Sequence, residues 1–445
     1  MGSNENRREF LAKAPVLAAG ATALLGSAVP AMFAQSGERR DSVEKEYLDF
    51  RAEDGGRSWG LYYRPAGKNP KTAILLMHPN GNNAQHFLTR RLAARGYAVF
   101  GAVGRWNPDP MKAVPETCLL DIAAYIKFIK ENYKVERIVL IGHSGGGGLF
   151  AFYQVQATTK PPGRYTSTPS GDPPDLNKYD MPAVDGLVCL AAHEGEGHIF
   201  NYRVDPSVVD ENDPLATDWT LDMYDARNGF RPAPASSKYS PEFIARYKAA
   251  QLDRCKRLDA KAFEMIARQR RAQEQMKSPE FSRLDPKDQT IIRRTAFFEP
   301  YMTIYRVSAM LSMADLSIDP SDRLVGNGSD PERPNFQGEG GEASVMTARG
   351  YLCTWSLLNS RMITNDNLRK ITVPTLVIGG TADLDELPGY IKGSYEASAA
   401  QDKNIAFIKG ANHGYMPVEP AAGGKNTQDE AAKVIADWLL KRFPA

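Results

Sequence analysis

A serine flanked by glycines is the feature of this sequence that points most directly to chemistry. Gly142-His143-Ser144-Gly145-Gly146 follows the apolar, β-branched run 137–141 and precedes a segment of helical character, 147–153. A strand, a G-x-S-x-G turn and a helix form a nucleophile elbow, which holds a serine hydroxyl on a tight, strained turn at the carboxyl end of a buried strand. The neighbouring glycines supply the minimal side chains that such a turn requires. The pattern predicts that Ser144 is a nucleophile, and the absence of a following Gly-Lys-Ser/Thr excludes a phosphate loop.

A serine nucleophile needs a base, and the base needs an acid that fixes its tautomer and stabilises its cation. In an elbow topology the order along the chain is serine, acid, histidine. Of the six histidines, only His193, His198 and His413 follow Ser144. His413 lies in a Gly-Ala-Asn-His-Gly turn just past the last expected strand, where a loop can bring the imidazole to the serine. His413 is therefore the predicted base.

The predicted acid follows the penultimate core strand. Asp383 ends the segment Gly-Gly-Thr-Ala-Asp that comes directly after the run 375–378. Asp385 and Glu386 are close rivals, and an ordinary Asx turn is the plain structural alternative. Glu194 and Glu196, at the end of the preceding strand, are less favoured as the acid.

Acyl transfer also needs donors for the developing oxyanion. The backbone N–H of Gly145, immediately after the nucleophile, is one expected donor. The second is expected from the loop after Met77, which reads His-Pro-Asn-Gly-Asn-Asn. Pro79 has no N–H, so Asn80 is the first candidate, with Gly81 behind it.

The elements that must position these residues alternate between strands and helices. Continuous apolar runs at 72–77, 97–100, 137–141, 186–190, 375–378 and 405–408 are typical of strands buried on both faces. The alternating segments 46–51 and 59–64, separated by Asp-Gly-Gly, predict an antiparallel hairpin before them. Helices are expected near 84–95, 116–132 and 427–442, the last begun by a Thr427-x-x-Glu430 capping box. The sequence predicts an α/β fold with a mostly parallel, doubly wound sheet.

This alternation stops between the fourth and fifth of those buried runs. Residues 194–361 contain acidic loops, helices and Gly/Pro punctuation, and Ser240-Pro241 is typical of the start of a long helix that extends to about residue 276. We expect a helical cap insertion here. Tyr301 and Tyr305 belong to an aromatic and methionine cluster that forms either the core of this subdomain or the apolar wall of a substrate pocket.

Together, Ser144, Asp383, His413, the strand-to-helix elbow and the His-Pro-Asn-Gly loop resemble the α/β-hydrolase superfamily. The resemblance covers residues 45–193 and 365–443 and leaves the insertion uncovered. It implies an eight-stranded sheet, a Ser-His-Asp triad, no cofactor and a cap after the sixth strand. Pro79 departs from the family, because many members carry the Gly of a His-Gly pair at that position.

Composition sets the broad class of protein. The 445 residues are 42% apolar and 24% charged, which is ordinary for a globular chain, and the net charge of +2 gives no case for nucleic acid or an anionic membrane as partner. The four cysteines show no metal spacing, and a Cys255–Cys353 bridge stays open. The oligomeric state is likewise undetermined by the sequence.

Residues 1–34 have the character of an export signal. Arg7-Arg8, followed by Phe-Leu and a lysine, resembles the twin-arginine motif, and a small-residue apolar stretch from 14 to 31 follows. Its glycines, alanines and prolines are poor for a stable membrane-spanning helix. We expect a cleaved signal peptide, no stable membrane insertion afterwards, and a periplasmic or secreted protein.

The segment His193-Glu194-Gly195-Glu196-Gly197-His198 superficially suggests zinc. A helical HExxH motif places its histidines four residues apart, whereas these are five apart with two glycines between them. No metal site is therefore expected. His193 and Glu194 leave the sheet beside the elbow strand and are expected to contact substrate or cap.

These residues predict a serine hydrolase, with a carboxylesterase acting on a bulky small molecule as the simplest case. Amide, thioester and carbon–carbon bond hydrolysis use the same triad and stay open. The rival from another class is a non-catalytic binding protein with the hydrolase fold, whose sequence signature would be a broken triad.

Overall fold

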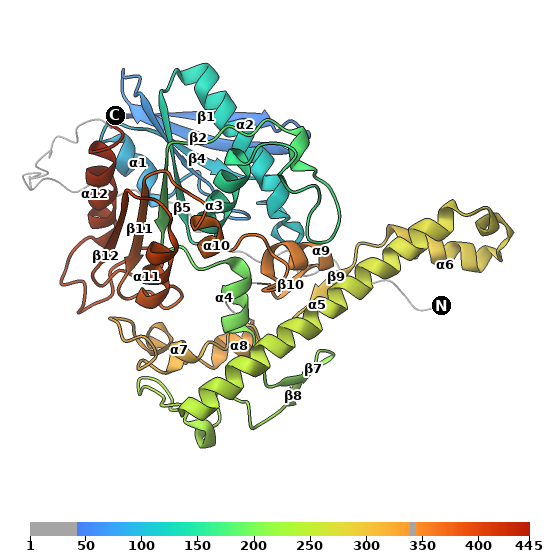
Figure 1. Ribbon diagram of the computed structural model, residues 1–445. Helices are drawn as coiled ribbons and strands as arrows, with labels where there is room; N and C mark the ends of the chain where they lie inside the picture. Colours follow the sequence, from blue (N-terminus) through green and yellow to red (C-terminus); the bar gives the residue numbers. More distant parts are fainter. Residues whose placement is uncertain (1–41, 339–342) are drawn as a thin grey trace, which may run out of the picture. The chain divides into compact units, whose positions relative to one another are not determined.

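A computed structural model describes residues 42–338 and 343–445, and an eight-stranded sheet runs through its centre (Figure 1). The strand order is β1-β2-β4-β3-β5-β6-β11-β12. β2 is antiparallel to both β1 and β4, and the remaining neighbours are parallel. The strands are β1 (Val43–Arg51), β2 (Arg57–Pro65), β3 (Thr72–Leu76), β4 (Ala98–Val103), β5 (Arg137–His143), β6 (Gly186–Leu190), β11 (Thr375–Gly380) and β12 (Lys403–Ile408). The mostly parallel, doubly wound sheet expected from the sequence is confirmed.

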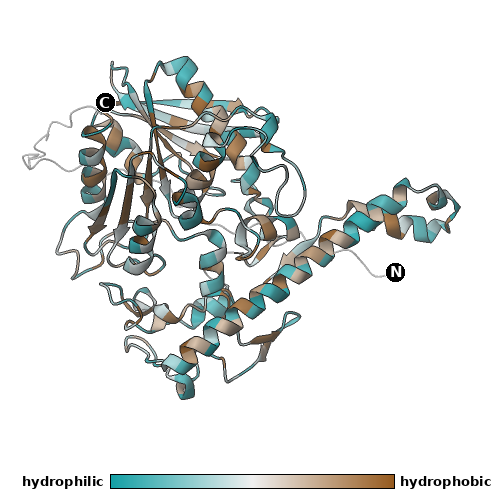
Figure 2. Ribbon diagram, in the orientation of Figure 1, coloured by the Kyte–Doolittle hydropathy of each residue, from teal (hydrophilic) through white to brown (hydrophobic). Residues whose placement is uncertain are grey.

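The central strands form because both of their faces are covered. Every residue of β3, β4, β6 and β11 is buried, and Figure 2 shows these strands as the most hydrophobic part of the sheet. One face packs against α2, α3 and α11, and the other packs against α1 and α12. These helices are α1 (Phe87–Ala93), α2 (Pro115–Tyr133), α3 (Gly145–Thr158), α11 (Pro388–Ala397) and α12 (Thr427–Leu440).

The start of α12 differs from the expected capping box. Asn426 is the N-cap, and its side chain accepts a hydrogen bond from the backbone N–H of Asp429. The Thr427 hydroxyl instead donates to the backbone oxygen of Tyr415 at 2.7 Å. The Thr427 hydroxyl is therefore used by the Tyr415 carbonyl and does not cap the helix.

The segment between β6 and β11 contains both helices and two small sheets. β7 pairs with β8, and β9 pairs with β10, which the sequence pattern did not reveal. The long helix predicted from Ser240-Pro241 is confirmed as α5, and the Ser240 hydroxyl accepts the Phe243 N–H at 3.1 Å. The elements are α4 (Glu196–Arg203), β7 (Val208–Asp210), β8 (Asp213–Thr217), α5 (Pro241–Lys277), α6 (Pro286–Phe297), β9 (Tyr301–Thr303), α7 (Leu311–Ala314), α8 (Arg333–Gln337), β10 (Val345–Thr347), α9 (Ala348–Gly350), the π-helix Tyr351–Trp355 and α10 (Thr364–Leu368).

Buried charge pairs hold this segment together. Arg254 of α5 is fully buried and makes two hydrogen bonds of 2.8 Å to the carboxylate of Glu211. Arg306 and Asp205 form a second buried pair at 2.8 Å. Each guanidinium also donates to backbone or hydroxyl oxygens, so the charges are hydrogen-bonded as burial requires.

Three further expectations from the sequence concern the cysteines, the signal peptide and membrane insertion. All four cysteines, including Cys255 and Cys353, are buried free thiols. The expected signal peptide, residues 1–34, lies outside the described residues. In the described part of the chain, no helix has the length and apolar character needed to cross a bilayer.

Candidate active site

The elbow at Ser144 has the strained geometry that the sequence predicts. Ser144 joins β5 to α3 with φ 54° and ψ −129°, a left-handed φ that a serine adopts only when its surroundings impose it. Its backbone N–H donates to Leu190 of β6 at 3.0 Å, and its carbonyl accepts from Gly147 at 2.9 Å. Hydrogen bonds on both sides of the residue therefore fix the turn.

Two glycines of the motif are required by close approaches. A Cβ at Gly142 would lie 2.3 Å from the backbone oxygen of Gly146, because the turn folds the first helical residues back onto the strand. A Cβ at Gly145 would lie 1.9 Å from Oε1 of Glu196 and 3.1 Å from Nε2 of His78. The first glycine makes room for backbone, and the second makes room for side chains of the site.

Asp383 and His413, from the loops after β11 and β12, meet as an acid–imidazole pair. His413 Nδ1 lies 2.9 Å from Oδ2 of Asp383. The other carboxylate oxygen accepts the backbone N–H groups of Asp385 and Glu386 at 2.9 and 3.0 Å. The Asp383 side chain is fully buried, whereas that of His413 is 30% exposed. A carboxylate held in this way fixes the Nδ1–H tautomer and leaves Nε2 to act as a base.

The two rival acids are engaged differently. Asp385 pairs with Arg203 of α4. Glu386 is 1% exposed, and burial, reinforced by repulsion from Asp383 and Asp385, raises its pKa well above 4.5. The carboxylate that is hydrogen-bonded to the His413 imidazole is Asp383.

A chain of imidazoles links His413 to the elbow. His86 Nδ1 accepts the Leu88 N–H at the start of α1, and His86 Nε2 lies 3.0 Å from Nδ1 of His143. His143 Nε2 lies 2.8 Å from the backbone oxygen of His413. One tautomer set satisfies all three contacts, with the proton on Nε2 of both His86 and His143.

Burial keeps both linking imidazoles neutral. It lowers the pKa of His86 to about 3 and that of His143 well below 6.5. Since His143 immediately precedes Ser144, this chain anchors the His413 loop to the nucleophile turn. Nothing in the linear pattern marked His86 or His143 for this role, because their partners are far apart in sequence.

A cavity of about 330 Å³ contains Ser144. Its lining combines polar and apolar side chains. The lining residues are His78, Asn80, Pro110, Met111, Ser144, His193, Glu196, Ala343, Ser344, Val345, Met346 and Trp355.

Glu196 is the charged group of this cavity. It begins α4, is 3% exposed, and its Oε2 lies 3.3 Å from Nε2 of His193. Burial raises the pKa of Glu196, but His193 and then His78 more than compensate, so that the net pKa falls below 4.5. Sequence reasoning considered Glu196 only as a remote alternative to the triad acid. The signal that could have found it is an acidic residue at the start of the helix after β6, combined with a glycine after the nucleophile.

The loop expected to supply the second oxyanion donor is organised around His78. His78 Nδ1 accepts the Gly81 N–H at 3.0 Å and lies 3.4 Å from the Asn80 nitrogen. Asn80 does line the cavity with Ser144, but its backbone N–H is directed at this imidazole. The N–H of Gly145 belongs to the first turn of α3, where helix amides lack an intrahelical partner.

The predicted substrate-contacting residues divide into two groups. His193 lines the cavity of Ser144, whereas Glu194 accepts hydrogen bonds from Tyr202 at 2.6 Å and Asn365 at 3.2 Å. Tyr305 lines a different cavity of about 400 Å³, and Tyr301 lies in β9 opposite Thr347. Of the four, only His193 is among the residues that surround Ser144.

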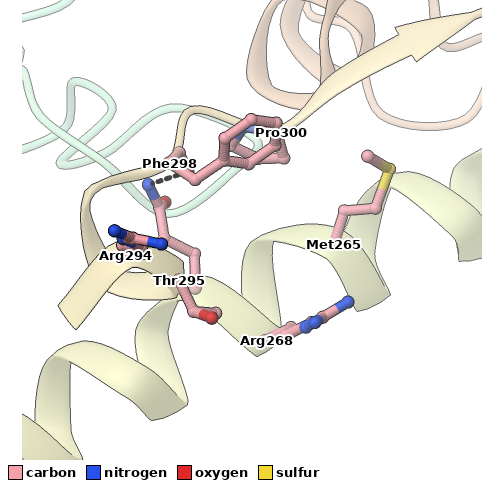
Figure 3. A pocket seen from close by; sticks show the side chains of 7 residues that line it. Met265, Arg268, Arg294, Thr295, Phe298 and Pro300 are labelled. Carbon is pink, nitrogen blue, oxygen red and sulfur yellow. Dashed lines mark hydrogen bonds between the residues drawn. The ribbon is translucent and has the colours of Figure 1, made fainter. Parts of the chain in front are cut away.

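A further cavity of about 340 Å³ lies between α5 and α6 (Figure 3). Figure 3 shows Met265, Phe298 and Pro300 around it, together with arginines. None of its lining residues belongs to the predicted catalytic set. This cavity is therefore distinct from the one that contains Ser144.

Within residues 42–338 and 343–445, one group of side chains could offer three metal ligands. Atoms of Asp383, Asp385 and His413 lie within 4.8 Å of one another. Asp383 already holds the imidazole and Asp385 already pairs with Arg203. His193 and His198 are not part of this group.

Comparison with known proteins found similar proteins among solved structures only. No protein-family model and no curated protein sequence matches the chain. Among solved structures, an α/β-hydrolase, GrgF, from a Penicillium species is 11% identical with a TM-score of 0.46, covering 90% of this chain and all of its own. An esterase from Butyrivibrio proteoclasticus is 11% identical with a TM-score of 0.43, covering 90% of this chain and 99% of its own.

A third similar structure is a brefeldin A esterase, described as a bacterial homologue of human hormone-sensitive lipase. It is 16% identical with a TM-score of 0.38 and covers 94% of this chain and 81% of its own. The eight-stranded, mostly parallel sheet is the architecture that the resemblance to the α/β-hydrolases implies. At these identities and TM-scores the similar structures establish no chemistry, so the chemistry is derived from the residues around Ser144.

Proposed function

We propose that the protein is a serine hydrolase that cleaves carboxylic esters through an acyl-enzyme. One observation carries the proposal: a serine on a strained strand-to-helix turn shares the carboxyl edge of one sheet with a buried carboxylate–imidazole pair, Asp383 and His413. This combination supplies nucleophile, base and orienting acid. Esters are the simplest substrates for it, and the cavity of about 330 Å³ suits a small organic molecule.

In the proposed reaction, Ser144 Oγ attacks the ester carbonyl while Nε2 of His413 takes the hydroxyl proton. Asp383 holds Nδ1 and stabilises the imidazolium that forms. The N–H of Gly145, at the positive end of α3, stabilises the oxyanion. The imidazolium protonates the leaving alcohol, and water, deprotonated by the same imidazole, then releases the acid from Ser144.

The test combines a covalent probe with a matched pair of serine variants. Wild-type protein should be labelled by a fluorophosphonate and should hydrolyse chromogenic esters. Ser144→Ala should abolish labelling and lower kcat about a million-fold, as loss of a triad serine does. The exposed Ser329 serves as control, because Ser329→Ala should leave both measurements unchanged.

Two outcomes would contradict the proposal. Substantial ester hydrolysis by Ser144→Ala would reject Ser144 as the nucleophile. Absence of labelling and of turnover in fresh wild-type protein would favour the non-catalytic binding protein. A parallel panel of amides and thioesters establishes which acyl bond is preferred.

A further inference from the structure

The carboxylate of Glu196 is built into the proposed acyl site. Oε1 occupies the space that a side chain at position 145 would fill, since a Cβ there would lie 1.9 Å from it. Position 145 directly follows the nucleophile, and its N–H is the expected oxyanion donor. Glu196 is thus in van der Waals contact with the residue that must stabilise negative charge during acyl transfer.

The surroundings of Glu196 leave one of its oxygens for a ligand. Oε2 faces Nε2 of His193 at 3.3 Å. Oε1 faces Gly145 and Nε2 of His78. No hydrogen bond from a described residue to Oε1 is present among the side-chain contacts of the site, and Glu196 itself lines the cavity.

Three other charged or titratable groups lie around Glu196. Arg203 of the same helix pairs with Asp385, and its charge also lowers the pKa of Glu196, though less than His193 and His78 do. His78 is held by the loop amides through Nδ1, and its burial lowers its pKa below 6.5, so this imidazole is neutral at pH 7. His193 contacts the opposite carboxylate oxygen.

An anion in this position disfavours an uncharged substrate. The oxyanion would develop close to a second negative charge in a largely water-excluded cavity, where charge interactions are stronger than in water. A cation on the substrate reverses the sign, because it pairs with Oε1 and screens the oxyanion from it. The apolar lining residues Met111, Val345, Met346 and Trp355 can pack against the hydrocarbon part of such a substrate.

We propose that this cavity selects acyl substrates that carry a protonated amine beside the scissile carbonyl, with Oε1 of Glu196 as the group that binds the ammonium. The proposal rests on the proposed serine hydrolase function and names its substrate class. Glu196 is the specificity-determining residue, and His193 orients it through the contact with Oε2.

The test uses three nearly isosteric p-nitrophenyl esters at pH 6.5, namely those of leucine, 2-hydroxy-4-methylpentanoic acid and 4-methylpentanoic acid. Each kcat/KM is divided by the spontaneous hydrolysis rate, which removes the intrinsic activation by the substituent. The wild type should prefer the leucine ester over both others. Glu196→Gln should reduce that preference about 30-fold or more, as loss of one partner of a buried charge pair does.

The control variant is Glu116→Gln. Glu116 is an equally buried carboxylate on α2 that is not among the residues lining this cavity. It should leave the leucine preference unchanged. Fluorophosphonate labelling shows whether each variant keeps a folded site, and the wild-type ranking of the three esters tests the proposal without any variant.

The outcomes separate the two proposals. If Ser144→Ala still hydrolyses the esters, the serine hydrolase proposal fails. If Ser144→Ala is inactive but the wild type does not prefer the leucine ester, the ammonium proposal alone is overturned. An equal preference for the hydroxy ester, or a preference retained in Glu196→Gln, overturns it as well.

Discussion

Two carboxylate–imidazole pairs lie near Ser144, and they differ in how their groups are exposed. In the first, the carboxylate of Asp383 is fully buried and the imidazole of His413 is 30% exposed. In the second, both groups are buried, with His193 5% and Glu196 3% exposed, and both line the cavity of Ser144. The first pair presents a base, whereas the second presents a negative charge.

The backbone explains why the same two groups have different roles. Asp383 receives two backbone N–H groups on one oxygen and the imidazole on the other, so both of its oxygens are occupied. Glu196 begins a helix, its Oε2 faces His193, and its Oε1 faces Gly145 and Nε2 of His78 without a hydrogen bond from a described residue. A carboxylate with both oxygens occupied orients its partner, while one with an oxygen left over can bind a ligand.

The largest expected effect that separates the pairs comes from neutralising the buried acid. Asp383→Asn should lower kcat about 10⁴-fold for every ester, because the amide favours the wrong imidazole tautomer, as in the trypsin-type triad. Glu196→Gln should not lower kcat for the uncharged ester. Steady-state kinetics with leucine and 4-methylpentanoate esters measures both. Comparable losses in the two variants would contradict the division of roles.

The first pair could be predicted from the sequence, but the second could not. The elbow around Ser144, with its flanking strand and helix, limits the acid and base to residues after later strands, and chain order then selects Asp383 and His413. The strands themselves follow from continuous apolar runs. This part depends on local pattern and on the rule that parallel strands end at one edge.

The role of Glu196 depends instead on a contact between distant segments. Its carboxylate fills a space left by Gly145, and no periodicity or spacing encodes that approach. The same limit applies to the histidine chain, in which His86 and His143 are joined only by the fold. Tyr301 and Tyr305 were interpreted as part of either a subdomain core or a pocket wall, and neither is among the residues that line the cavity of Ser144.

A smaller expected effect concerns how the ester preference set by Glu196 and His193 depends on pH. His193 is the main partner that lowers the pKa of Glu196, which lies below 4.5. His193→Gln removes this stabilisation of the carboxylate, so the pKa should rise. The preference for the ammonium ester requires the ionised form and is lost as pH falls through that pKa. The variant should therefore lose the preference at a higher pH than the wild type.

The measurement is the ratio of kcat/KM for the leucine and 4-methylpentanoate esters from pH 4 to pH 7.5. Both esters share the same nucleophile and base, so titration of His413 cancels in the ratio. An unchanged midpoint in His193→Gln would show that the imidazole does not tune Glu196. A midpoint shifted downward would contradict the sign derived from the contact.

The smallest expected effect concerns the carboxylic acid nearest to the first pair. Burial raises the pKa of Glu386 well above 4.5, and neither carboxyl oxygen has a hydrogen-bond partner among the described residues. Burial thus favours the neutral form of Glu386, and Glu386→Gln replaces that form by a neutral group of the same shape. Its kcat should stay within about twofold of wild type, as for changes worth less than 0.5 kcal/mol. A loss as large as that of Asp383→Asn would identify Glu386 as the acid that supports His413.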